Sequence, residues 1–131
     1  MSKKALLLDT QAFLFALNSP ELIPLKTRKF FNSEDLDLYL SMASVWEMGI
    51  KSSLGKLKFE NPLKEIIRTA IKESGLKILP IQAEHIYFIE DLPFHHKDPF
   101  DRIIIAQSLV EKMPIITSDV VFDQYKTKRL W

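Results

Sequence analysis

Apolar residues along the chain gather in short runs that are spaced either for strands or for helices. Residues 4–8 form a brief apolar run ended by a polar residue, which is typical of a buried strand. Further strands are predicted at residues 37–40, 77–81 and 115–117, and residues 125–131 would add a last strand at the edge. These runs supply the strands of a sheet.

Helical spacing fills most of the intervals between the predicted strands. Helices are predicted at residues 10–17, 24–31, 41–51 (or 43–51), 61–75, 82–91 and 98–112. Asn61-Pro62 and Asp98-Pro99 each place a capping residue before a proline of the first turn, and Gly75 is expected to end the helix that Asn61 begins. Alternating strands and helices indicate βαβ units, so the fold class is α/β with a mainly parallel sheet covered on both faces.

Length and composition are those of one soluble globular domain. The 131 residues suit a single domain spanning residues 1–131, and the 47% apolar and 27% charged fractions are ordinary. The lack of cysteine excludes disulfides, thiolate zinc sites and a cysteine nucleophile, and it fits a cytoplasmic location. The first apolar run, residues 5–8, is too short for a signal peptide, and no run is long enough to span a membrane.

Four acids interrupt apolar segments where folding alone does not explain them. Asp9 and Asp119 follow two predicted strands, Asp101 lies in the first turn of a very apolar helix, and Glu47 lies within another helix. Ligands of open parallel sheets bind outside the carboxyl ends of the strands, so the four side chains can share one crevice. Converging carboxylates repel one another, and a divalent cation held by oxygen ligands is the usual remedy. A metal-dependent hydrolytic site is therefore the leading hypothesis.

Each of these acids also has a purely structural interpretation. Asp9 suits a turn after a strand, Glu47 suits a solvated helix face, and Asp101 suits a helix N-terminus. Asp119 can cap a loop, and Asp98 is interpreted mainly as the cap of its helix. Setting the four acids of the hypothesis aside raises the net charge from +1 to +5, so the rest of the chain is mildly basic and compatible with a polyanionic substrate.

Four short motifs contain these acids and occur together in one order. They are residues 7–10 (LLDT), 44–51 (SVWEMGIK), 96–107 (HKDPFDRIIIAQ) and 116–119 (ITSD). This combination resembles the PIN domain and, more narrowly, the VapC-type toxins of type II toxin–antitoxin systems. The resemblance covers nearly the whole chain, and the segment Asp-Pro-Phe-Asp-Arg adds most to its specificity. One departure is Gln11, where many relatives carry histidine or another polar residue.

The resemblance implies a three-layer α/β/α sandwich with a mainly parallel sheet of four or five strands. It implies an endoribonuclease that depends on Mg²⁺, with Mn²⁺ as a substitute, and that a cognate antitoxin inhibits. Its RNA substrate would be tRNA or rRNA. The family's four acids correspond to Asp9, Glu47, Asp101 and Asp119, and its hydroxyl residue before the last acid corresponds to Thr117 or Ser118.

Metal-activated water would hydrolyse the phosphodiester bond without a histidine base, and no histidine was expected among the acids. Asp9 and Asp101 are expected to be the closest ligands of the metal, with Asp119 and Glu47 completing its surroundings directly or through water. Three hydroxyl residues would orient these waters or carboxylates: Thr10, Thr117 and Ser118. Three side chains are candidate substrate contacts: Arg102, Lys51 and His96. His85 is expected to lie on the surface.

Other functions are weighed on single residues. A phosphatase of the haloacid dehalogenase type needs a second aspartate two positions after Asp9, where the chain has Gln11. A receiver domain needs a phosphoacceptor aspartate after its third strand, where the chain has Gln82. The remaining alternative is a PIN-fold module that binds RNA or a partner without cleaving it. The apolar first quarter of the chain and its small size also favour a homodimer or a groove for an antitoxin helix.

Overall fold

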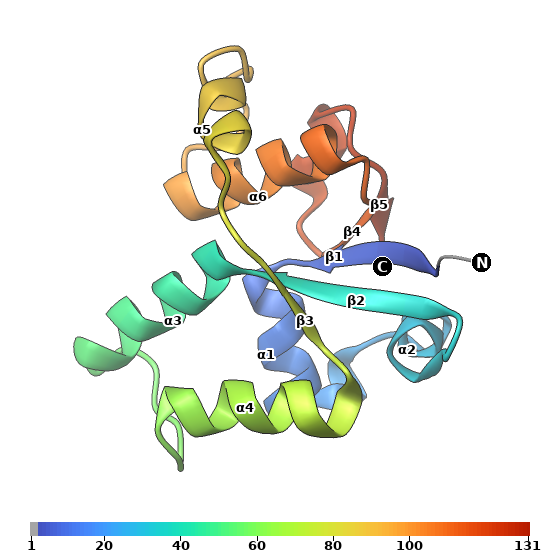
Figure 1. Cartoon of the computed structure of the whole chain (residues 1–131), viewed down its shortest axis with the longest axis vertical. Helices are drawn as coiled ribbons and strands as arrows, with labels where there is room; N and C mark the ends of the chain where they lie inside the picture. Colours follow the sequence, from blue (N-terminus) through green and yellow to red (C-terminus); the bar gives the residue numbers. More distant parts are fainter. Residues whose placement is uncertain (1–2) are drawn as a thin grey trace.

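A parallel sheet forms the centre of the computed structural model, which describes residues 3–131 (Figure 1). Within these residues the sheet has five strands in the order β3-β2-β1-β4-β5, and every neighbouring pair is parallel. The strands are β1 (Lys4–Leu8), β2 (Leu36–Ser41), β3 (Lys77–Leu79), β4 (Ile115–Ile116) and β5 (Arg129–Leu130). The predicted parallel α/β sheet is thus confirmed.

Helices cover both faces of this sheet (Figure 1). The α-helices are α1 (Thr10–Asn18), α2 (Leu25–Asn32), α3 (Met42–Ser53), α4 (Leu63–Ser74), α5 (Ala83–Ile89) and α6 (Pro99–Glu111). Two 3-10 helices join them, η1 (Pro20–Leu22) and η2 (Val120–Gln124). The figure shows α5 and α6 on one side of the sheet and α1, α2 and α4 on the other, which is the expected three-layer arrangement.

The central strand β1 is buried on both faces because its side chains alternate between two cores. Leu7 packs in the cluster that includes Ile104 and Ile105 of α6. Leu6 and Leu8 point the other way, into the cluster beneath α1 and α4. All three leucines are at most 2% exposed. This burial explains why the strand is a continuous apolar run and not an alternating one.

Helix ends agree with most of the sequence signals. Asp98 caps α6 by accepting a hydrogen bond from the backbone N–H of Asp101, at 3.0 Å. Gly75 ends α4 with φ 71°, a left-handed conformation that glycine adopts without strain. The expected cap at Asn61 is wrong, because α4 begins at Leu63 and its cap is Pro62, whose side chain accepts no hydrogen bond.

The topology brings the ends of two adjacent central strands together. The chain leaves β1 at Asp9, and β4, which pairs directly with β1, leads through Thr117 and Ser118 to Asp119. Both acids therefore lie at the carboxyl edge of the sheet, as expected for a ligand site. Among the described residues, no helix has the length and apolar character needed to cross a membrane.

Candidate active site

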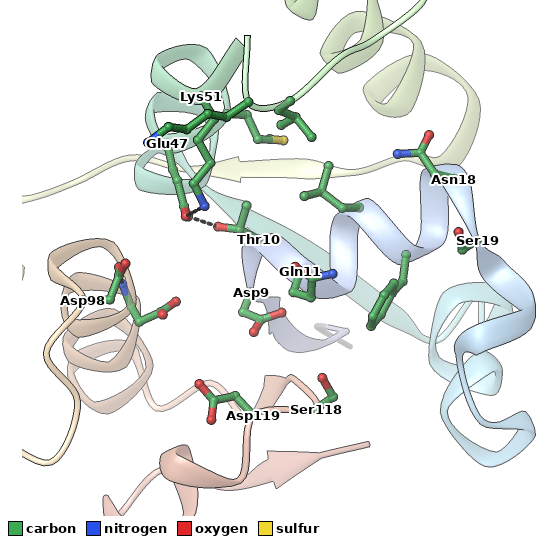
Figure 2. A pocket seen from close by; sticks show the side chains of 16 residues that line it. Asp9, Thr10, Gln11, Asn18, Ser19, Glu47, Lys51, Asp98, Ser118 and Asp119 are labelled. Atoms are coloured by element: carbon green, nitrogen blue, oxygen red, sulfur yellow. Dashed lines mark hydrogen bonds and ion pairs between the residues drawn. The ribbon is translucent and has the colours of Figure 1, made fainter. Parts of the chain in front are cut away.

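The four acids of the hypothesis meet in one pocket at the carboxyl edge of the sheet. This pocket has a volume of about 610 Å³ and is open to solvent. Figure 2 shows its walls, with β1 and α1 in the middle, α3 on one side, and α6 and the residues after β4 on the others. Its acidic lining residues are Asp9, Glu47, Asp98, Asp101 and Asp119.

Asp9 is the most deeply placed of these acids. Its Oδ1 accepts a hydrogen bond from the backbone N–H of Ala12, at 2.7 Å, and so caps α1. Its Oδ2 accepts a hydrogen bond from Thr117 Oγ1 at 2.5 Å. Burial raises the pKa of Asp9 to about 6, although both hydrogen bonds favour the charged form. Asp9 therefore has a structural role as the cap of α1, which the sequence did not predict, and this cap fixes where its carboxylate points.

Thr117 links the acids of β1 and β4. Its hydroxyl donates to Asp9 and accepts a hydrogen bond from the backbone N–H of Asp119, at 3.0 Å. Asp119 then uses its Oδ1 to accept from the backbone N–H of Val121 and caps η2. Between the two hydroxyl residues left open by the sequence, Thr117 orients an acid, whereas Ser118 lines the pocket.

Glu47 enters the pocket from α3 and is only 6% exposed. Its Oε1 accepts a hydrogen bond from Thr10 Oγ1 at 2.8 Å, and its Oε2 lies 2.7 Å from Lys51 Nζ (Figure 2). The hydrogen bond to Glu47 raises the pKa of Lys51. Glu47 is thus neither a solvated helix residue nor an unpaired buried charge, and Thr10 has the supporting position expected of it.

Asp101 and Asp119 lie on either side of a histidine. The Nε2 atom of His96 is 3.2 Å from Asp101 Oδ2 and 3.0 Å from Asp119 Oδ2. One ligand atom from each of the three side chains lies within 4.8 Å of the others, which is close enough to hold a metal ion. Burial, and then the neighbouring Asp98 carboxylate, raises the pKa of Asp101 to about 7. Asp98 thus acts on the site electrostatically besides capping its helix.

The expectation that no histidine would stand among the acids is wrong. His96 belongs to the loop before α6, five residues ahead of Asp101, and this loop folds back over the site. The spacing of residues in the sequence shows no sign that this loop folds back over the site. His85 was expected on the surface, but it is fully buried, with Nδ1 accepting from the backbone N–H of Gln82 and Nε2 lying 2.8 Å from Glu111.

Arg102 also differs from its expected role. Its side chain is buried, and its guanidinium donates hydrogen bonds to the backbone carbonyls of Leu92, Pro93 and His96. The same group lies over the ring of Phe94, 4.0 Å from its centroid. An arginine committed to three carbonyls is not free to bind a phosphate, so Arg102 braces the loop of residues 92–96 from inside.

The donor atoms of the pocket fit a hard divalent cation. Carboxylate oxygens are the ligands that Mg²⁺ and Mn²⁺ prefer, and the pocket offers no thiolate because the chain has no cysteine. Two of the acids have pKa values raised by burial and by neighbouring charges, so the group is crowded as it stands. A bound cation would relieve this crowding by stabilising the charged carboxylates.

The parallel α/β fold and the acidic pocket can be compared with those of known protein families. The family model described as the PIN domain matches residues 6–128, nearly the whole chain. The protein therefore belongs to the PIN domain family.

Solved structures show the same fold at low sequence identity. VapBC2 from Rickettsia felis, solved bound to a promoter DNA fragment, matches with a TM-score of 0.73 and 13% identity, over 96% of this chain and 97% of that one. VapBC-1 from nontypeable Haemophilus influenzae matches with a TM-score of 0.67 and 17% identity, over 96% of each chain. DNA-bound VapBC from Salmonella typhimurium matches with a TM-score of 0.65 and 13% identity, over 98% of this chain and 97% of that one. No curated protein sequence matches the chain.

Proposed function

We propose that this protein is an endoribonuclease that uses a divalent cation, Mg²⁺ with Mn²⁺ as a substitute, to hydrolyse RNA. The observation that carries the proposal is the convergence of Asp9, Glu47, Asp101 and Asp119 in one pocket, although they are spread over most of the sequence. Four acids in one solvent-open pocket destabilise the fold, and their presence is explained if they bind a metal ion that the reaction needs.

The biological role that we propose is that of a VapC-type toxin in a type II toxin–antitoxin system. Membership of the PIN family and the structural likeness to proteins solved as VapBC complexes support this role. The partners would be a cognate antitoxin protein, which inhibits the enzyme, and a tRNA or rRNA substrate. Such an enzyme would act in the cytoplasm, where its substrates are.

In the proposed reaction the chain's own residues hold the charges and aim the carboxylates. A bound cation would supply an activated water and neutralise charge on the phosphate. Asp9, held by Thr117 and the N-terminus of α1, and Asp101 would be its main ligands, with Asp119 and Glu47 completing the set. Thr10 fixes the carboxylate of Glu47 at the pocket wall.

Lysines on the wall of the pocket would bind the RNA backbone. Lys51 and Lys56 both line the pocket, on the side of α3 and the residues that follow it. Lys51 already neutralises Glu47, and its side chain remains 49% exposed, so its ammonium can also meet a phosphate oxygen. These contacts fix the position of the backbone and carry no base specificity.

Cleavage of RNA by the purified protein is the direct test of the proposed function. We expect cleavage of tRNA or rRNA with Mg²⁺ or Mn²⁺, no cleavage with EDTA, and recovery when the metal is restored. The reason is that the proposed reaction needs the cation that the acids bind. Single-stranded DNA of matched length is the control substrate. If the protein binds Mn²⁺ but cleaves none of these RNAs, it is instead a PIN-fold binding module.

We also propose that the protein forms a homodimer through the outer face of α3. Trp46 is 60% exposed there and packs edge-on against Phe100, with centroids 5.0 Å apart, while Ile86 of α5 is 50% exposed. Pro99, Phe100 and Ile103 of α6 and Trp46 line a small apolar hollow together with Ile86. Apolar side chains gathered in this way are typical of an interface.

Replacing Trp46 with lysine is expected to convert the dimer to a monomer, because a charged side chain would be buried in the interface. Light scattering after size-exclusion chromatography measures the mass. Leu25→Lys is the control, since Leu25 is 75% exposed on α2, away from this face. A wild-type protein that is monomeric at micromolar concentration contradicts the proposal.

A further inference from the structure

His96 connects two of the acids that the proposed nuclease would use. Its Nε2 lies 3.0 Å from Asp119 Oδ2 and 3.2 Å from Asp101 Oδ2. Asp101 is in the first turn of α6, whereas Asp119 follows β4, so the two acids come from segments that are not continuous with each other. One ring nitrogen therefore fixes the relative position of two separate walls of the pocket.

The other ring nitrogen decides whether His96 acts as a donor or as a metal ligand. Nδ1 accepts a hydrogen bond from the backbone N–H of Asp98, at 3.2 Å. A nitrogen that accepts in this way carries no hydrogen, so the ring hydrogen is on Nε2. Coordination of a metal at Nε2 would need the lone pair that this hydrogen occupies. The geometry therefore favours an N–H donor that faces two carboxylates.

The residue is held on every side by the protein. Its backbone N–H donates to Tyr125 Oη at 2.7 Å, and its carbonyl accepts from Arg102 Nη1 at 3.2 Å. Its ring packs edge-on against Phe122, with centroids 5.7 Å apart. The supports are themselves fixed, since Tyr125 and Arg102 also donate to the carbonyl of Pro93. Arg102 forms no ion pair within residues 3–131, and its buried guanidinium is thereby explained as a support of His96.

We propose that His96 is a positioning residue that holds the carboxylates of Asp101 and Asp119 together for the cation, an inference that rests on the proposed function. An N–H between two carboxylate oxygens reduces their repulsion, and without it they are expected to separate. The N–H of Nε2 is hydrogen-bonded to Asp119 Oδ2 and lies 3.2 Å from Asp101 Oδ2. Each carboxylate has about four lone-pair sites, so these contacts leave the others available to a cation. His96 touches neither RNA nor metal in this role.

Metal affinity, measured without RNA, tests the proposal separately from the nuclease activity. His96→Phe keeps a ring against Phe122 but removes both nitrogens, while His96→Gln restores an amide N–H close to the position of Nε2. By Mn²⁺ titration followed by electron paramagnetic resonance, we expect His96→Phe to bind about 10- to 100-fold more weakly and His96→Gln to bind nearly as wild type. Equal affinity of all three proteins, or equal loss in both variants, overturns the proposal.

Spectroscopy and kinetics distinguish a positioning residue from a ligand or a substrate contact. Electron spin echo modulation of wild-type protein with Mn²⁺ is expected to show no directly bonded nitrogen; a nitrogen signal that His96→Phe abolishes would make His96 a ligand and overturn the proposal. In RNA cleavage, His96→Phe is expected to lower kcat when the metal concentration is limiting, and kcat should return to the wild-type value at high metal concentration. The KM for RNA should stay unchanged. A raised KM with normal metal affinity contradicts the proposal. If His96→Phe does not fold by circular dichroism, His96→Leu takes its place in both measurements.

If the wild type binds Mn²⁺ but cleaves no RNA, the proposed function fails while the metal titration still decides the role of His96.

Discussion

Replacing Asp101 with asparagine is expected to slow RNA cleavage strongly and, at the same time, to stabilise the metal-free protein at pH 8. Burial and the Asp98 carboxylate raise the pKa of Asp101 to about 7, so its charged form is destabilised in the folded state. Asparagine has the same shape, keeps an oxygen for His96 and carries no charge. We expect a gain of about 2–4 kcal/mol, which corresponds to a rise in unfolding temperature on the order of 10 °C. The loss of a charged ligand should lower kcat about 10³-fold.

Opposite effects on activity and stability separate a functional acid from a structural one. The two measurements are cleavage of RNA with Mg²⁺ and thermal unfolding in EDTA. Asp123→Asn is the matched control, because Asp123 pairs with Arg129 on the surface and lies outside the pocket; it should change neither property much. An Asp101→Asn protein that melts earlier than wild type would make Asp101 a structural residue, and one that cleaves as fast as wild type would exclude it from the metal site.

Metal-free protein is expected to lose stability as the pH rises from 5.5 to 8, and saturating Mg²⁺ is expected to restore it. The pKa values of Asp9 and Asp101 are raised from 3.8 to about 6 and about 7. The folded state therefore binds more protons than the unfolded chain, and the stability associated with these protons is lost as the pH rises through 6 and 7. For Asp9 alone the full loss is about 3 kcal/mol, most of it between pH 4 and 6, and about 1 kcal/mol of it falls above pH 5.5. A cation that binds only the folded protein offsets the loss by mass action.

Urea unfolding at several pH values, with EDTA or with Mg²⁺, measures this dependence. The Asp9→Asn/Asp101→Asn double variant is the control, since every other ionisable group of the chain is unchanged in it. We expect its stability to vary less with pH than that of wild type and to respond little to Mg²⁺. If the stability of the wild type and of the double variant varied with pH in the same way, Asp9 and Asp101 would not be the source of the pH dependence.

The sequence predicted the framework of the fold because local signals and burial agree there. The run of residues 4–8 is a strand, Asp98-Pro99 begins α6, and Gly75 ends α4, as their patterns indicate. The short 3-10 helices η1 and η2 were not predicted, since a single turn leaves no periodic pattern. The expected strand at residues 125–131 is reduced to Arg129–Leu130, and Tyr125 packs in the core.

The convergence of the four acids in the candidate site could be predicted from the sequence, but the residues that hold them could not. Asp9 and Asp119 follow from the rule that ligands bind at the carboxyl ends of parallel strands. His96 and Arg102 depend instead on a loop that folds back through hydrogen bonds to backbone carbonyls. Every residue type has a backbone carbonyl that can accept such a bond, so the acceptors leave no pattern in the sequence. His85 was misplaced because a histidine that finds partners for both ring nitrogens can be buried at little cost.

The strand order has a consequence for the stage of synthesis at which the acidic pocket can form. β1 is made first, yet one of its two neighbours in the sheet is β4, so its edge stays open until residue 116 has left the ribosome. Thr117, which holds Asp9, and Asp119 follow immediately after β4. A chain that stops before this point lacks both the central pairing and the last acid. We therefore expect unfinished chains to lack the complete acidic pocket, which can form only when translation is almost complete.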